Sequence, residues 1–235
     1  MTDSPSVVLV HGAFADASGF AGVIHELEAD GITVYAPANP LRSLTIDAET
    51  VAAFVSSIPG PVVLAGHSYG GSVITQMGDL PNVTALVYIA AFGLEVGETS
   101  LSAQEPFPPT KLATSARPSS YDAVGSPGGP ELSIDLAQFT ETFCADLPAE
   151  VQAVMAVTQR PVAAASLGEA ATRAAWKSKP SWFIVATQDN AISPDAERFF
   201  AQRMGATTTE VEASHVVFAS QPKVTADVIR AAIAG

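Results

Sequence analysis

The sequence contains little cysteine and no long apolar run, and each scarcity excludes a class of protein. Its single cysteine, Cys144, excludes an intramolecular disulfide and a cysteine-rich metal site. No apolar stretch approaches the roughly 20 residues that a membrane-spanning helix needs. Residues 1–5 lack the basic and apolar regions of a secretory signal peptide. We therefore expect a cytoplasmic protein with a reduced thiol and no membrane contact.

Basic residues are also scarce, because 11 Lys and Arg stand against 24 Asp and Glu, which leaves a net charge of −13. Such a surface repels nucleic acid and anionic lipid and favours solubility. The four histidines, His11, His25, His67 and His215, show no spacing typical of metal ligands. We expect neither a metal site nor a nucleic-acid partner.

The apolar pattern is that of a folded α/β protein. Apolar residues make up 48% of the 235 residues and charged residues 15%, which excludes a disordered chain. Short apolar runs predict six strands, at residues 7–10, 33–36, 62–65, 83–89, 181–186 and 207–211. Longer stretches predict helices at residues 20–30, 47–58, 70–78, 194–204 and 222–234. Because the strands are continuously apolar, we expect a mainly parallel sheet with helices on both faces.

This alternation of strands and helices stops between residues 93 and 176. Connections of such length are often functional insertions such as lids. The first part is rich in proline and glycine, including Pro127 and Gly128, and predicts loop structure. Residues 135–176 predict three short helices, separated near Pro148 and Pro161. The predicted organisation is one α/β core, residues 1–92 and 177–235, with an inserted helical cap, residues 93–176.

The strongest functional signal is Gly-His-Ser-Tyr-Gly at residues 66–70, between a predicted strand and a predicted helix. A serine at such a sharp turn projects above the sheet, and the flanking glycines avoid clashes in the strained backbone. The N-terminus of the following helix favours negative charge that develops beside the serine. This context predicts that Ser68 is a nucleophile.

A serine nucleophile needs a base and a group that orients the base. His215 follows the last predicted strand, and Asp189 follows the strand at 181–186. Both positions lie at the carboxyl ends of strands, where open parallel sheets place their sites. Asp195 is a rival acid, but the adjacent Pro194 suggests the first turn of a helix. We therefore predict His215 as the base and Asp189 as the orienting acid.

Acyl transfer also needs hydrogen-bond donors for the oxyanion. His11-Gly12-Ala13-Phe14 follows the first strand, and Gly12 allows close approach of the backbone to a ligand. The N–H groups of Ala13 and Tyr69 are the predicted donors, with Phe14 as the alternative to Ala13. We interpret His11 as a brace for this loop, and expect His67 to point away from the nucleophile.

These motifs resemble those of the α/β-hydrolase superfamily: Val-His-Gly-Ala-Phe at 10–14, Gly-His-Ser-Tyr-Gly-Gly at 66–71, and the later acid and histidine. The closer similarity is to small bacterial carboxylesterase-like members, related to plant methylesterases and hydroxynitrile lyases. The resemblance implies the α/β-hydrolase fold, a Ser68–His215–Asp189 triad, an acyl-enzyme intermediate and no cofactor. The chain departs from the full pattern because it lacks the N-terminal hairpin, which leaves about six strands.

Two alternatives to a serine esterase stay open at this point. Hydroxynitrile lyases of this type carry a lysine after the triad histidine and a threonine in the oxyanion loop. Here Val216 and Gly12 occupy those positions, which argues against lyase activity. A member that only binds small molecules is the second alternative, and the intact nucleophile, base and acid argue against it.

Aromatic residues of the oxyanion loop and the predicted cap are the candidate substrate contacts. They are Phe14, Phe107, Phe139, Phe143 and Trp176, with Met155 as a further inward candidate. The predicted cap has few basic residues, and none lies beside a motif residue, although a buried substrate anion would need one. The sequence therefore favours small, neutral carboxylic esters, cleaved by a monomer or homodimer.

Overall fold

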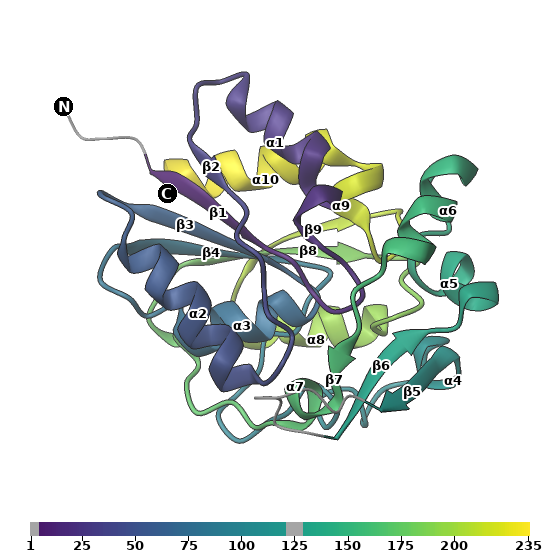
Figure 1. Ribbon diagram of the computed structural model, residues 1–235. Coiled ribbons are helices and arrows are strands. Elements are labelled where there is room, and N and C mark those ends of the chain that lie inside the picture. The colour runs from purple at the N-terminus through teal and green to yellow at the C-terminus, as the bar shows by residue number, and fades with distance from the viewer. Residues whose placement is uncertain (1–4, 121–128) are drawn as a thin grey trace.

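A six-stranded parallel sheet forms the centre of the protein, in the order β2-β1-β3-β4-β8-β9 (Figure 1). The computed structural model describes residues 5–120 and 129–235, so residues 1–4, Pro127 and Gly128 lie outside the described residues. The strands are β1 (Ser6–Val10), β2 (Val34–Tyr35), β3 (Val62–His67), β4 (Val83–Ile89), β8 (Ser181–Ala186) and β9 (Thr207–Val211). The predicted parallel sheet is therefore confirmed.

The strand order creates a crevice above the carboxyl ends of β1 and β3. From β1 the chain moves to β2 on one side, and then returns to pair β3 with β1 on the other side. At such a reversal the two connections leave in opposite directions, and open α/β sheets bind their ligands there. The register aligns Val10 with Gly66, so the loops that follow the two strands start at the same level.

Helices cover both faces of the sheet (Figure 1). One face carries α1 (Ala21–Glu28), α9 (Val217–Ser220) and α10 (Pro222–Ala234), and the other carries α2 (Leu44–Ser56), α3 (Tyr69–Met77) and α8 (Pro194–Met204). The short 3-10 helix η1 (Ala17–Phe20) leads into α1. Helix α2 begins three residues before the prediction, because the Ser43 side chain accepts a hydrogen bond from the Ile46 N–H and caps it.

The segment between β4 and β8, residues 90–180, lies at the carboxyl edge of the sheet and is called the inserted segment below. The three helices predicted in its second part are present as α5 (Leu136–Phe143), α6 (Ala149–Thr158) and α7 (Ala164–Gly168). It also contains α4 (Leu112–Ser115), β5 (Ala116–Ser120), β6 (Pro130–Ile134), β7 (Val162–Ala163) and the 3-10 helix η2 (Ala175–Lys177).

The prediction of loop structure is wrong for β5 and β6, which pair antiparallel and form a small sheet with β7. Proline removes a backbone donor and is therefore tolerated at sheet edges. Pro118 lies in β5, the edge strand, and most of β5 is exposed, so neither alternation nor a long apolar run marked it.

Ion pairs tie the inserted segment to the core on two sides. The Arg42 guanidinium, in the loop before α2, bonds Glu131 at 3.2 Å and donates to the Pro161 carbonyl at 3.0 Å. On the other side Arg203 of α8 pairs with Glu98 at 2.7 Å. These contacts hold the inserted segment over the crevice. None of the helices in residues 5–120 and 129–235 is both long and apolar enough to span a membrane.

Candidate active site

Ser68 occupies the sharp turn between β3 and α3. Its φ of 55° and ψ of −124° lie in a region that residues with side chains rarely adopt. The turn is held from both sides, since the Ser68 N–H donates to the Ile89 carbonyl at 3.2 Å and its carbonyl accepts from the Gly71 N–H at 2.9 Å. The surrounding fold thus fixes a strained conformation that presents this hydroxyl.

Two glycines allow the backbone to pack closely around this turn. A Cβ on Gly70 would lie 2.3 Å from the Val10 carbonyl oxygen, and a Cβ on Gly12 would lie 2.7 Å from the Ser68 Cβ. Neither distance is compatible with a side chain unless the backbone shifts. The pattern of glycines in the sequence therefore reflects the contact between the loop after β1 and the Ser68 turn.

The structure brings Asp189 and His215 together, and His215 lines the same cavity as Ser68. Asp189 follows β8, His215 follows β9, and the His215 Nδ1 lies 2.5 Å from the Asp189 Oδ2. The other Asp189 oxygen accepts hydrogen bonds from the N–H groups of Ala191 at 2.6 Å and Ile192 at 2.9 Å. A carboxylate held in this way keeps the proton on Nδ1, which leaves Nε2 as the acceptor.

Asp195, the rival acid, lies elsewhere. Its side chain is 66% exposed in the first turn of α8 and pairs with Arg198 at 3.1 Å. The proline beside it begins that helix, as the sequence suggested. Asp189 is therefore the acid that the fold supplies to His215.

The loop after β1 carries the candidate oxyanion donors. Ala13, Phe14 and Tyr69 all line the cavity that contains Ser68. Tyr69 is the first residue of α3, so its N–H has no acceptor within the helix. Phe14 has a φ of 60°, in the left-handed region, so the loop after β1 turns sharply at this cavity-lining residue.

His11 braces the same loop, as its position in the sequence suggested. Its Nδ1–H donates to the Gly12 carbonyl at 3.0 Å, and its Nε2 accepts from the Asn39 N–H at 2.9 Å. One donated and one accepted hydrogen bond require a neutral ring. Burial lowers the pKa of His11 below its ordinary value, which agrees with that assignment.

His67 does not line the cavity that contains Ser68 but contacts His215, which the sequence analysis missed. Its Nε2–H donates to the His215 carbonyl at 3.0 Å, and the two rings lie 4.6 Å apart. Burial, and then the proximity of His215, hold the pKa of His67 well below its ordinary value. A neutral His67 thereby fixes the backbone of the loop that carries His215. No spacing in the sequence marks this contact, because 148 residues separate the partners.

A buried tyrosine and aspartate anchor the start of α3. The Tyr69 hydroxyl donates to the Asp47 Oδ2 at 2.8 Å, and the other Asp47 oxygen accepts from the Arg42 N–H at 3.0 Å. Burial raises the pKa of Asp47, although these two hydrogen bonds lower it. The backbone N–H of Tyr69 is therefore held by its side chain as well as by the helix.

Ser68 and His215 line one cavity of about 50 Å³. Its polar lining includes Ser100 and Gln104, and its apolar walls include Phe92, Leu101, Leu112, Phe143, Leu167 and Ile192. No Lys or Arg of the described residues lines it. Within residues 5–120 and 129–235, no three His, Cys, Asp or Glu side chains are grouped as metal ligands would be.

Of the predicted substrate contacts, Phe14 and Phe143 line this cavity. The other three, Phe107, Phe139 and Trp176, do not line it. Phe139 is buried behind Phe143 at 5.2 Å between ring centroids, and Phe107 packs on Phe199 at 5.5 Å. Trp176 lies at the base of the inserted segment, where its Nε1–H donates to the Leu94 carbonyl at 2.8 Å. Phe139 is part of the buried core, and Phe107 and Trp176 are partly buried against it.

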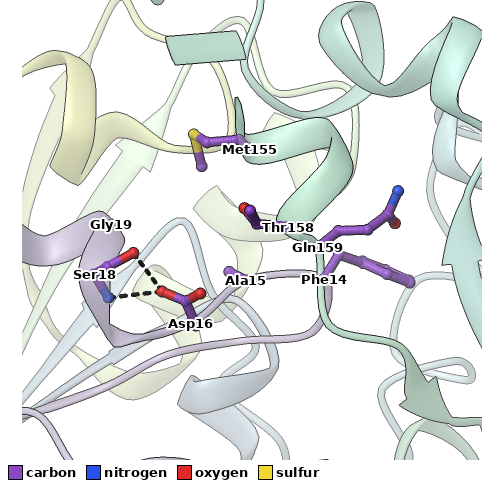
Figure 2. Close-up of a pocket in the computed structure, with 8 residues that line it drawn as sticks. All are labelled: Phe14, Ala15, Asp16, Ser18, Gly19, Met155, Thr158 and Gln159. Carbon is purple, nitrogen blue, oxygen red and sulfur yellow. Dashed lines mark hydrogen bonds between the residues drawn. The ribbon is translucent and has the colours of Figure 1, made fainter. Parts of the chain in front are cut away.

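A second, smaller hollow lies beside the oxyanion loop, as Figure 2 shows. It has a volume of about 40 Å³ and is lined by Phe14 and Asp16 on one side and by Met155 and Thr158 of α6 on the other. Phe14 is common to both hollows. Met155 therefore faces inward, as expected, but into this hollow rather than toward Ser68.

Comparisons with known proteins agree with this fold. A model of the alpha/beta hydrolase family matches residues 7–228. The alpha/beta hydrolase nvfD of Aspergillus novofumigatus is 27% identical over 208 residues, which cover 80% of this chain and 79% of that protein. A pyrethroid hydrolase from Sphingobium faniae JZ-2 has a similar structure, with a TM-score of 0.82, 21% identity and 98% of each chain covered. Polyneuridine aldehyde esterase gives a TM-score of 0.84 at 20% identity, over 97% of this chain and 99% of that one. Because the family model spans nearly the whole sequence, the protein belongs to the alpha/beta hydrolase family.

Proposed function

We propose that this hydrolase is a serine carboxylesterase that cleaves small, neutral esters through an acyl-enzyme intermediate. The observation that carries the proposal is the shared cavity: Ser68 and His215 line it, and Asp189 holds His215 from behind. The esterase among the structural neighbours is consistent with this chemistry.

In the proposed reaction the Ser68 Oγ attacks the ester carbonyl carbon while His215 Nε2 takes the hydroxyl proton. Asp189 keeps His215 in the required tautomer and stabilises the imidazolium. The N–H groups of Tyr69 and Ala13 stabilise the negative oxygen of the tetrahedral intermediate. His215 then gives its proton to the departing alcohol, which leaves the acyl group on Ser68. Water, activated by the same histidine, releases the acid.

The size of the cavity favours short acyl groups. One water requires roughly 10–15 Å³ of this kind of volume, so a cavity of about 50 Å³ has room for only a few atoms beyond the ester carbonyl. Larger acyl groups would have to displace Phe143, Leu101 or Leu167 from the walls. Displacing packed side chains costs free energy, and a short acyl group fits without this displacement.

The charges around the cavity favour neutral substrates. Three basic residues of the inserted segment are engaged by carboxylates away from the cavity: Lys111 by Glu141, Arg117 by Asp135, and Arg173 by Asp79. A buried substrate carboxylate without a cationic partner would be costly. The net charge of −13 adds long-range repulsion, which salt screens.

The test is a series of p-nitrophenyl esters compared by kcat/KM. We expect the acetate or butyrate ester to be the best substrate, the octanoate ester to be poorer, and a matched ester bearing a carboxylate to be poorer still at high salt. Ser68→Ala measures the background, and Ser100→Ala is the matched control because Ser100 lines the same cavity. Turnover that survives in Ser68→Ala would reject the nucleophile, and a preference for the anionic ester would reject the substrate class.

A further inference from the structure

A second buried carboxyl lies directly behind the Asp189–His215 pair. Glu197 of α8 is completely buried, at 0% exposure. Its Oε2 accepts a hydrogen bond from the Ala186 N–H, at the end of β8, at 2.9 Å. Its Oε1 has no hydrogen-bond partner among the described residues. An acceptor left without a donor at such depth is costly and requires an explanation.

The neighbouring carboxyl offers the explanation. Ala186 links the two groups, since its N–H donates to Glu197 and its carbonyl accepts from the Asp189 N–H at 3.2 Å, and the negative charge of Asp189 raises the pKa of Glu197. Two carboxylates have no proton to share, so a hydrogen bond between these groups requires one of them to be a carboxylic acid. Asp189 already accepts from three donors: the N–H groups of Ala191 and Ile192, and His215. Glu197 accepts from one. The group with more donors is the better stabilised anion, which places the proton on Glu197.

Electrostatics point the same way. Burial, followed by the negative charge of Asp189, holds the pKa of Glu197 well above its usual range. Both arginines of α8 are engaged by other carboxylates: Arg198 lies at the surface and is bound by Glu210 and Asp195, and Arg203 pairs with Glu98. His215 faces Glu197 only through Asp189, and His67 lies beyond His215 as a neutral ring.

We propose that Glu197 is a positioning residue for the proposed esterase site: as a carboxylic acid it donates its proton in a hydrogen bond to Asp189, and so sets the pH at which His215 becomes protonated. The donated hydrogen bond withdraws negative charge from Asp189 and fixes the rotation of its carboxylate. His215 then faces a weaker anion and loses its proton at a lower pH than it would beside an unshared aspartate. This inference depends on the proposed function for its effect on turnover, but not for its effect on the histidine.

Two substitutions separate this role from simple packing. Glu197→Gln keeps an oxygen for the Ala186 N–H and supplies an amide N–H to Asp189, so it imitates the protonated acid. Glu197→Met has similar length and no donor. The direct readout is an NMR titration of His215 in protein with labelled histidine, which requires no activity. We expect Glu197→Gln to titrate as the wild type does, and Glu197→Met to raise the His215 midpoint by about 0.5 pH units or more.

The pH profile of kcat/KM for a short ester should follow the same order, with the acid limb unmoved in Glu197→Gln and moved to higher pH in Glu197→Met. An ionised Glu197 predicts the reverse for the first variant: removing its charge would lower the His215 midpoint, and that result overturns the proposal. A purely structural role predicts reduced stability with unchanged midpoints in both variants, which overturns it as well.

A spectroscopic measurement keeps the proposal testable where Glu197→Met does not fold. Infrared difference spectra of wild type against Glu197→Gln at pH 7 should show the carbonyl band of one protonated carboxylic acid, lost in the variant. A carboxylate band lost instead refutes the assignment. If the wild type shows the acid band and the histidine titrates as expected but no ester is cleaved, the proposed function fails and the inference about Glu197 stands.

Discussion

The hydrogen bond between Tyr69 and Asp47 offers a sharp test of how the Ser68 turn is held. Tyr69→Phe removes one hydroxyl and leaves the ring in place. Both partners are completely buried, so water cannot replace the lost donor. The Asp47 carboxylate would keep the Arg42 N–H on its other oxygen.

The expected cost follows from the charge of the acceptor. A hydrogen bond to a charged group contributes about 1.5–3 kcal/mol, against about 0.5–1.5 kcal/mol between neutral groups. The chain also contains a buried tyrosine hydrogen bond between two neutral groups, since the Tyr88 hydroxyl lies 2.9 Å from the Thr75 hydroxyl. Tyr88→Phe is therefore the matched control, and we expect it to lower the free energy of unfolding by less than Tyr69→Phe does.

The pH dependence gives a second criterion. Burial raises the pKa of Asp47, and the Tyr69 hydroxyl opposes that rise. Without the hydroxyl the folded-state pKa rises further above the unfolded value, so Tyr69→Phe loses most stability at neutral pH, where Asp47 is ionised. The loss should shrink as pH falls through the Asp47 titration, because a protonated Asp47 needs the donor less.

Urea unfolding of wild type, Tyr69→Phe and Tyr88→Phe at pH 7 and near pH 4.5 measures both criteria. Equal costs for the two variants, or a Tyr69→Phe cost that does not change with pH, would refute the reasoning that an ionised Asp47 holds Tyr69. A lower kcat without a higher KM in Tyr69→Phe would further support the proposed role of the Tyr69 N–H as an oxyanion donor, because such a donor acts mainly in the transition state.

Three further outcomes are expected. Gly12→Ala should reduce kcat at least tenfold with little loss of fold, because its Cβ would lie 2.7 Å from the Ser68 Cβ; unchanged kinetics would contradict the close approach. Asp189→Asn should lower kcat by about 10⁴-fold while circular dichroism stays unchanged, since the wrong histidine tautomer is favoured; a loss below tenfold would count against Asp189 as the orienting acid. Burial keeps His67 neutral in the folded protein, whereas the unfolded chain binds a proton at this residue below about pH 6.5. The free energy of unfolding should therefore fall by about 1.4 kcal/mol per pH unit as the pH drops below about 6.5. His67→Gln should remove that slope, and His25→Gln, on an exposed helix face, should not.

The sheet and its helices could be predicted from the sequence because their signals are local. Strands β4, β8 and β9 have the predicted bounds. For β8 the reason is an apolar run that ends sharply, between Pro180 and Thr187. Helix α8 begins at Pro194 and ends before Gly205, which adopts the left-handed conformation that favours glycine. The Ser68 turn could also be predicted from the sequence, because close backbone contacts require the glycines that mark it.

The inserted segment resisted prediction because its contacts are not local. Strands β5 and β6 pair across residues 121–128 and carry few buried side chains. Aromatic composition also could not tell Phe143, which lines the cavity, from Phe139 four residues earlier, which packs behind it. The contacts of His67 and Glu197 with the Asp189–His215 pair join residues from separate strands and helices, so only the folded chain brings them together.

The proposed role of Ser68 as a covalent nucleophile is tested most directly by a fluorophosphonate probe followed by mass spectrometry of the digested protein. We expect a single adduct on the peptide that contains Ser68, formed in wild type and in Ser100→Ala and absent from Ser68→Ala. Ser100 is the strict internal comparison, because its hydroxyl lies in the same cavity and bonds Ser72, and no histidine of residues 5–120 and 129–235 is hydrogen-bonded to it. An adduct on Ser100, or undiminished labelling of Ser68→Ala, would contradict the assignment of Ser68 as the nucleophile.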